Sequence, residues 1–82
     1  MTIMEITYSK PAVKAISRMD YLLKQRIKAA VEKLPAGDVK KLTGYSYAYR
    51  LRVGDWRILF DMKQDIKITN ILPRGEAYKK GV

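Results

Sequence analysis

The stretch Tyr49–Phe60, which reads YRLRVGDWRILF, constrains the fold of this chain more than any other. Apolar and charged residues alternate along it on both sides of Gly54-Asp55, a dipeptide typical of a tight β-hairpin turn. Because the turn sets the register, three pairs are expected on the core face of the hairpin. These pairs are Val53 with Trp56, Leu51 with Ile58, and Tyr49 with Phe60.

The other face of this predicted hairpin concentrates positive charge. In the same register Arg52 lies directly opposite Arg57, and Arg50 lies opposite Leu59. Like charges at directly opposed positions destabilise a sheet by roughly 0.2–1 kcal/mol, so this arrangement does not serve stability. We interpret the three guanidinium groups as an exposed surface for a polyanion. Ordinary polar residues on the solvent face of a sheet are the alternative.

Composition narrows the possible functions. The chain has 82 residues, which is enough for one small domain, predicted to span residues 1–82. It has neither Cys nor His and its acids are scattered, so we predict no metal site, no cofactor and no thiol nucleophile. Its 17 Lys and Arg against 8 Asp and Glu give a net charge of +9, which favours nucleic acid or an acidic protein as partner. Without a long apolar run, no membrane contact is expected, and a cytoplasmic location is predicted.

The N-terminal half is predicted to form a strand over residues 3–8 and then two helices. Ser9 and Asp20 are typical N-cap residues, and apolar residues follow each at helical spacing. The first helix is expected to bury Ala12, Val13, Ile16 and Met19, and the second Leu23, Ile27, Ala30, Val31 and Leu34. Because almost no loop separates them, the helices should form an antiparallel hairpin packed on the sheet.

The C-terminal half completes the predicted architecture. Residues 39–46 are expected to be a connector, and a last strand over residues 66–72 should end at Pro73, which cannot donate to a ladder. The tail RGEAYKKGV is expected to form a helical turn that places Arg74 and Tyr78 on one face. The predicted fold is α+β: an N-terminal strand, an α-helical hairpin, a three-stranded antiparallel meander and a short C-terminal helical turn.

The candidate functional residues are basic or aromatic. The candidates for binding phosphates and stabilising the charge that develops in phosphoryl transfer are Arg50, Arg52, Arg57 and Arg74. Tyr78 either packs on the core or projects toward the arginines, where it could stack on a base or exchange a proton. Nearby cations would lower its ordinary pKa of about 10. Aromatic residues interleaved with cations are typical of surfaces that stack single-stranded bases. Further candidates for RNA binding are therefore Lys40, Lys41, Tyr45 and Tyr47.

The segments KLTGYSYAYRLRVGDWRILFDM and ILPRGEAYKK, with this order of elements, resemble the RelE toxins of prokaryotic toxin–antitoxin pairs, within the RelE/ParE superfamily. The resemblance implies a RelE-like β-α-α-β-β-β fold and a metal-independent endoribonuclease, an mRNA interferase that inhibits translation. Such a toxin enters the A site of the 70S-type ribosome, where the 2′-hydroxyl of the mRNA attacks the adjacent phosphate. By position, the family's catalytic roles fall on Arg50, Arg52, Arg57, Arg74 and Tyr78.

The resemblance also implies a cognate RelB-like antitoxin as protein partner. An acidic, partly disordered antitoxin suits the basic surface and is expected to occupy or displace the tail around Tyr78.

Two departures from the family pattern bear on the chemistry. Some members carry Lys on the second strand, whereas Arg50 and Arg52 are effectively never deprotonated. Many relatives have His where this chain has Pro73. Our hypothesis is that the arginines act electrostatically, that Tyr78 is the acid or base, and that the ribosome aligns the 2′-hydroxyl for in-line attack.

Three other functions are compatible with these residues. A ParE-like gyrase inhibitor without catalysis is disfavoured, because those relatives generally lack the arginine and tyrosine set. A non-cleaving RNA-binding module would use the same face for phosphates. A degenerate toxin would fold but cleave slowly, because Arg stands at the Lys positions.

Overall fold

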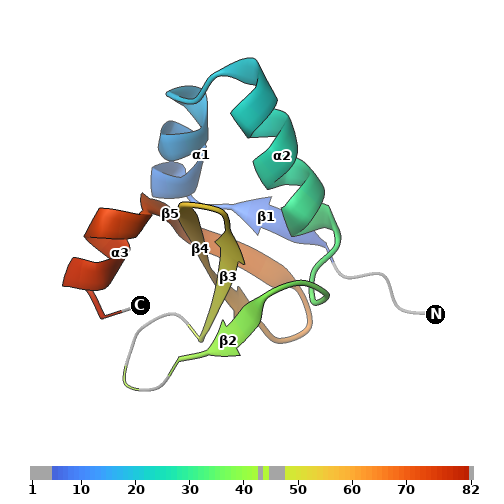
Figure 1. Cartoon of the computed structure of the whole chain (residues 1–82). Helices are drawn as coiled ribbons and strands as arrows, with labels where there is room; N and C mark the ends of the chain where they lie inside the picture. The colour runs from blue at the N-terminus through green and yellow to red at the C-terminus, as the bar shows by residue number, and fades with distance from the viewer. Residues whose placement is uncertain (1–4, 43, 45–47, 82) are drawn as a thin grey trace.

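Helices cover both faces of a central sheet in the computed structural model, which describes residues 5–42, 44 and 48–81 (Figure 1). The helices α1 (Lys10–Ser17) and α2 (Tyr21–Glu32) cover one face, and the short α3 (Arg74–Lys79) packs against the other. The strands are β1 (Ile6–Tyr8), β2 (Val39–Lys41), β3 (Tyr49–Val53), β4 (Trp56–Met62) and β5 (Ile66–Pro73). Within the described ranges, each helix is too short and too polar to cross a membrane.

The strands form one mixed sheet in the order β1-β5-β4-β3-β2. The antiparallel meander β3–β4–β5 confirms the predicted α+β core of the fold, while β1 pairs parallel with β5 at one edge. The prediction of a plain connector over residues 39–46 was wrong at its start. Residues Val39–Lys41 form β2, which pairs antiparallel with β3 at the other edge.

Both predicted N-caps are confirmed. The Ser9 Oγ accepts a hydrogen bond from the Ala12 N–H at 3.3 Å, and the Asp20 Oδ1 accepts one from the Leu23 N–H at 2.8 Å. The apolar stripe of α2 is buried or packed against the core as expected. The prediction for Val13 was wrong: its side chain is 54% exposed, because one residue beyond buried Ala12 a helix has turned by about 100°.

The register predicted for the hairpin is confirmed at all of its pairs. Leu51, Ile58 and Phe60 are buried in the core under the helices. The Tyr49 ring stacks on that of Phe60 with centroids 5.4 Å apart. Gly54 has φ +56°, the left-handed conformation that the tight turn needs.

The opposite face of the sheet carries a second, smaller hydrophobic cluster. Leu59, Leu72 and Ala77 are buried there and Leu42 packs against them, so β4, β5 and α3 are joined. Arg57 lies on this same face of the sheet and is only 7% exposed. The expectation that all three hairpin arginines are exposed was therefore wrong for Arg57, and also for Arg50, whose side chain is only 14% exposed. Arg52 is exposed as expected.

Candidate active site

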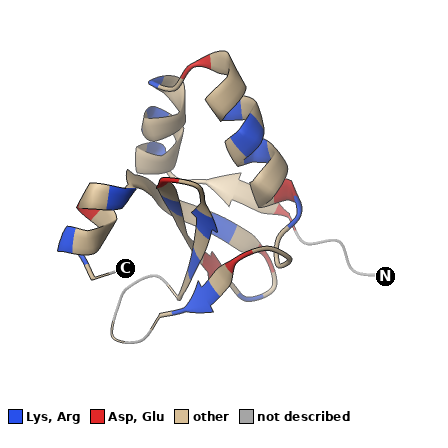
Figure 2. Ribbon diagram, viewed as in Figure 1, with Lys and Arg blue, Asp and Glu red and all other residues tan. Residues whose placement is uncertain are grey.

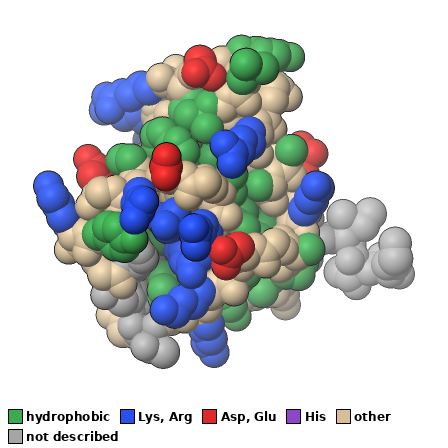
Figure 3. Space-filling model, viewed as in Figure 1, with side chains coloured by type: hydrophobic (Ala, Val, Ile, Leu, Met, Phe, Trp, Pro, Cys, Tyr) green, Lys and Arg blue, Asp and Glu red, His purple; other side chains and the backbone are tan. Residues whose placement is uncertain are grey.

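A hollow of about 160 Å³ lies on the sheet face opposite α1 and α2. Cationic and phenolic side chains from four separate elements line it together with Leu42 and Gly81; they are Lys40, Arg50, Arg52, Arg57 and Tyr78. In Figure 3, Lys and Arg side chains gather at the centre of the view, over β3. The hollow thus joins three of the four arginines predicted from the sequence with the predicted tyrosine.

Strand pairing places like charges directly opposite one another twice on this face. Arg52 pairs with Arg57 across β3 and β4, as predicted, and Lys40 pairs with Arg50 across β2 and β3. Figure 2 shows the Lys and Arg positions of β2 and β3 side by side. Such pairs oppose folding, so a cluster of two of them is best explained by an anionic ligand.

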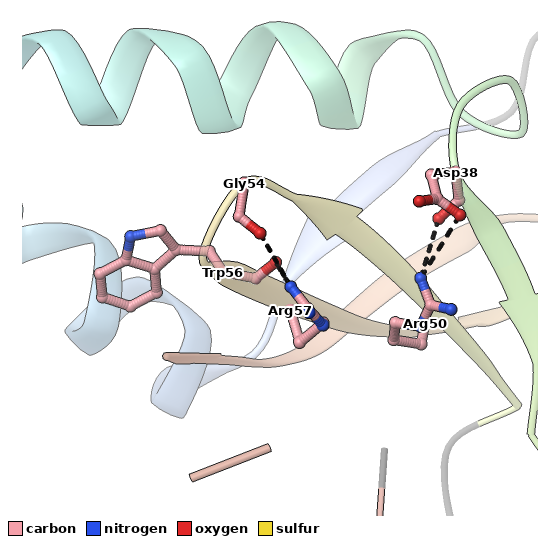
Figure 4. A network of polar contacts seen from close by, with 5 residues as sticks. All are labelled: Asp38, Arg50, Gly54, Trp56 and Arg57. Atoms are coloured by element: carbon pink, nitrogen blue, oxygen red, sulfur yellow. Dashed lines mark hydrogen bonds and ion pairs between the residues drawn. The ribbon is translucent and has the colours of Figure 1, made fainter. Parts of the chain in front are cut away.

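Arg57 is fixed by the backbone of its own hairpin. Its Nη1 donates hydrogen bonds to the carbonyl oxygens of Gly54 at 2.9 Å and Trp56 at 3.1 Å (Figure 4). Both acceptors are neutral, so the guanidinium keeps its full charge while its position is held. Among the described residues, no carboxylate lies within ion-pair distance of it.

Arg50 is held differently. Its Nη1 lies 3.6 Å from Asp38 Oδ1 and donates to the Asp38 carbonyl oxygen at 3.3 Å (Figure 4). Asp38 stands just before β2 and was missed in the sequence, because only the pairing of β2 with β3 brings it beside Arg50. This carboxylate offsets part of the repulsion between Arg50 and Lys40.

Helix α3 places Tyr78 at the hollow. The backbone N–H of Arg74 donates to the Asp55 carbonyl oxygen at 2.7 Å, which ties the start of α3 to the hairpin turn. The Arg74 Nε then donates to the Tyr78 hydroxyl at 3.3 Å, and the guanidinium lies 5.3 Å from the centroid of the Tyr78 ring. The predicted helical turn with Arg74 and Tyr78 on one face is therefore confirmed.

The surroundings of Tyr78 favour its ionised form. The hydrogen bond and charge of Arg74, and more weakly the charges of Arg57 and Arg52, hold the pKa of Tyr78 below its ordinary value. The same contact raises the pKa of Arg74. Tyr78 is 61% exposed, so its hydroxyl is open to a bound ligand.

The remaining predicted residues lie elsewhere. Arg74 does not line the hollow. It is linked to the site by its hydrogen bond to the Tyr78 hydroxyl. Lys41 pairs with Tyr49 and so lies on the opposite side of the sheet from Lys40, which argues against a place for it in this hollow. Tyr45 and Tyr47 lie outside the described residues.

The arrangement suits an anion more than a cation. Four cationic side chains and a phenol with a lowered pKa surround a space that no described carboxylate lines. Within the described part of the chain, no three acidic side chains come together as ligands for a metal ion. Guanidinium groups bind phosphate oxygens and stabilise developing negative charge, so the site can hold a phosphodiester beside a titratable hydroxyl.

The chain is similar to known proteins in both sequence and fold. No family model matches the chain. The curated protein Toxin RelE3 of Methanocaldococcus jannaschii is 30% identical, over 92% of this chain and 96% of its own length. The RelE–RelB complex of Pyrococcus horikoshii OT3 contains a similar chain, with TM-score 0.72 and 30% identity over 94% of this chain and all of that one.

The RelB–RelE antitoxin–toxin complex of Methanococcus jannaschii also matches, with TM-score 0.72 and 26% identity over 90% of this chain and 96% of that one. These likenesses span nearly the whole chain, in sequence and in fold. The chain therefore belongs to the RelE toxin family.

Proposed function

We propose that this RelE-family toxin is a ribosome-dependent, metal-independent endoribonuclease that cuts mRNA at the codon in the A site. The observation that carries the proposal is the hollow that Tyr78 lines together with four cationic residues, Lys40, Arg50, Arg52 and Arg57. Repulsion between the opposed cations is relieved when a phosphodiester enters. The toxin thereby gains binding energy at the position where the transition state gains charge.

The reaction is an internal transfer within the RNA. The 2′-oxygen forms a bond to phosphorus, the bond from phosphorus to the 5′-oxygen breaks, and a cyclic phosphate and a free 5′-hydroxyl result. The Tyr78 phenolate takes the proton of the 2′-hydroxyl, and water returns a proton to the leaving oxygen. The lowered pKa of Tyr78 increases the fraction of phenolate near neutral pH, which favours its role as the base.

The arginines have separate tasks in this reaction. Arg57 is already fixed by two carbonyl oxygens, so it presents its charge to the phosphoryl oxygens without reorganising. Arg52 is exposed and free to close on the phosphate. Arg74 acts on Tyr78 and is a positioning residue.

The ribosome supplies the alignment that this small hollow lacks. In-line attack requires the 2′-oxygen, the phosphorus and the 5′-oxygen to be nearly collinear, and free RNA rarely adopts that geometry. Holding it in the A site converts the step into one with an effective molarity that reaches 10⁵ M or more, on the order of 7 kcal/mol. Cleavage is therefore expected on the ribosome and not on free mRNA.

A RelB-like antitoxin is the proposed protein partner. The two archaeal structures described above are complexes of RelE with RelB. The net charge of +9 and the exposure of Tyr78 leave a basic surface with a reactive group open to an acidic chain. We expect the antitoxin to cover or displace α3, which would separate Tyr78 from the hollow. The toxin and this partner are expected to meet mRNA and ribosomes in the cytoplasm.

Single-turnover cleavage of ribosome-bound mRNA, read by primer extension, tests the function. Tyr78→Phe is expected to slow cleavage by about 10²-fold or more, because it removes the base but keeps the ring. Tyr21→Phe removes a hydroxyl from an exposed tyrosine at the start of α2 and is expected to cleave at the parental rate.

A wild-type toxin that binds ribosomes without cutting would show a non-cleaving RNA-binding module. DNA damage on expression, with intact mRNA, would point to gyrase inhibition. Full activity in Tyr78→Phe would remove Tyr78 from proton transfer.

A further inference from the structure

Arg52 lines a second depression as well as the hollow. This groove, of about 470 Å³, lies between the C-terminal half of α2 and the hairpin of β3 and β4, beside the part of β3 that extends beyond β2. Its cationic lining consists of Arg26, Lys33 and Arg52. In Figure 3, blue side chains stand over β3 and again above it on α2.

Arg26 in α2 and Lys33, the C-cap residue of that helix, both line the groove beside the hairpin. Arg26 and Lys33 are seven residues apart, which places them on one side of α2 two turns from each other. The Arg26 guanidinium reaches across to the turn: a Cβ built on Gly54 would lie 2.9 Å from Arg26 Nη2. The groove is therefore bordered by cations from both the helix and the strand.

These cations lack acidic partners. The one ion pair among the described residues joins Arg50 to Asp38, so no described carboxylate lies within 4.0 Å of Arg26, Lys33 or Arg52. Asp38 also lines the groove, but its carboxylate is directed to Arg50. Small residues make up much of the remaining wall, namely Ala29, Ala30, Ala36 and Gly37, and they let a backbone approach closely.

We infer that this groove binds RNA backbone phosphates that flank the linkage held in the hollow. Arg52 belongs to both depressions, so one strand can leave the hollow and continue along α2 without losing contact with positive charge. This inference deepens the proposed function and rests on it. RNA is favoured over an acidic protein because the groove extends the phosphate site directly through a shared side chain.

The test removes the two helical charges and measures RNA binding off the ribosome. In Arg26→Gln/Lys33→Gln, two phosphate contacts are lost, and each contributes about 0.7 to the slope of log affinity against log salt for a single strand. Fluorescence anisotropy with a short single-stranded RNA is expected to show a slope shallower by about 1.4. Affinity should fall roughly 25-fold at 0.1 M salt, and the difference should vanish near 1 M.

The matched control is Lys14→Gln/Lys28→Gln, which removes the same charge from residues that do not line the groove. It is expected to bind RNA within about twofold of the parent at 0.1 M salt. Arg26→Lys/Lys33→Arg keeps both charges and should retain the parental slope. Circular dichroism melting establishes that each variant is folded before binding is compared.

Three outcomes would overturn the inference. The groove variant could keep the parental affinity and slope, or both double variants could weaken RNA binding equally, which would reduce the effect to net charge. Unchanged RNA binding with weaker binding of a RelB-like antitoxin would assign the groove to an acidic protein. Failure of the proposed cleavage is a separate result, because anisotropy reports binding without any chemical step.

Discussion

Arg52→Gln is expected to stabilise the fold and weaken the toxin. Arg52 lies directly opposite Arg57, whose guanidinium is nearly buried, so the unfavourable pair is removed when the charge at position 52 is lost. Like charges at such positions cost roughly 0.2–1 kcal/mol, and the exposure of Arg52 favours the middle of that range, about 0.5 kcal/mol. For a domain of this size, that gain corresponds to a rise of about 2–4 °C in the melting temperature.

The cleavage rate should change in the other direction. Arg52 borders the space where the phosphate is proposed to sit, so loss of its charge is expected to slow single-turnover cleavage by about 10²-fold, the low end of what one electrostatic donor contributes. Thermal unfolding at low salt and at 1 M salt measures the stability, and ribosomal cleavage measures the rate. The gain in stability should shrink at high salt, where repulsion is screened.

Arg50→Gln is the matched control for stability. It removes a repulsion from Lys40, but it also removes the contact with Asp38, so the melting temperature is expected to stay the same or fall. If Arg52→Gln melts below the parent at low salt, the opposed arginines do not repel measurably. Repulsion between Arg52 and Arg57 could then no longer be taken as a sign that this surface binds an anion.

Three further predictions concern single contacts. Arg74→Met should return the pKa of Tyr78 toward its ordinary value, seen by carbon-13 NMR of labelled tyrosine; an unchanged pKa would contradict the proposed coupling. Because the folded-state pKa of Tyr78 lies below the unfolded one, the fold should gain stability as pH rises through the folded-state pKa, and Arg74→Met should lose that gain. Gly54→Ala should cost about 1–2 kcal/mol in urea unfolding, since φ is +56° and the new Cβ meets Arg26; parental stability would show that the turn relaxes. Asp20→Ala should cost about 1 kcal/mol by losing the N-cap of α2, and an unchanged melting temperature would show that the cap contributes nothing.

Local chemistry explains why much of the fold was predictable. The Gly54-Asp55 turn fixes the hairpin register, and a slip by one residue would expose Leu51 and bury Arg52. The caps at Ser9 and Asp20 are equally local, because each side chain bonds an N–H three residues on. Such signals lie within a few residues of each other and need no tertiary contact.

Apart from the exposure of Val13, the features that the sequence did not predict depend on pairing between distant segments. Strand β2 has three residues, two of them Lys, and only its register against β3 makes it a strand. The burial of Arg57 depends on α3 folding over Leu59, a contact across almost twenty residues. The contact of Arg74 with Tyr78 was predicted, but the position of Arg74 outside the hollow was not. That position depends on the tertiary hydrogen bond from the Arg74 N–H to the carbonyl oxygen of Asp55.

The two opposed arginines of the hairpin differ in mobility, because Arg57 is fixed by backbone carbonyl oxygens and Arg52 is exposed. Arg57 lies where the small cluster under α3 meets the hairpin turn, so its charge is positioned when the protein folds. If RNA binds as proposed, positioning this side chain therefore adds no entropic cost to binding. Arg52 extends from the same face into solvent, and ordering its side chain on binding costs up to about 2 kcal/mol of conformational entropy. A phosphate that contacts both offsets that cost by removing their mutual repulsion. We therefore expect the repulsion between Arg52 and Arg57, which is unfavourable in the free protein, to increase the affinity of the site for an anion.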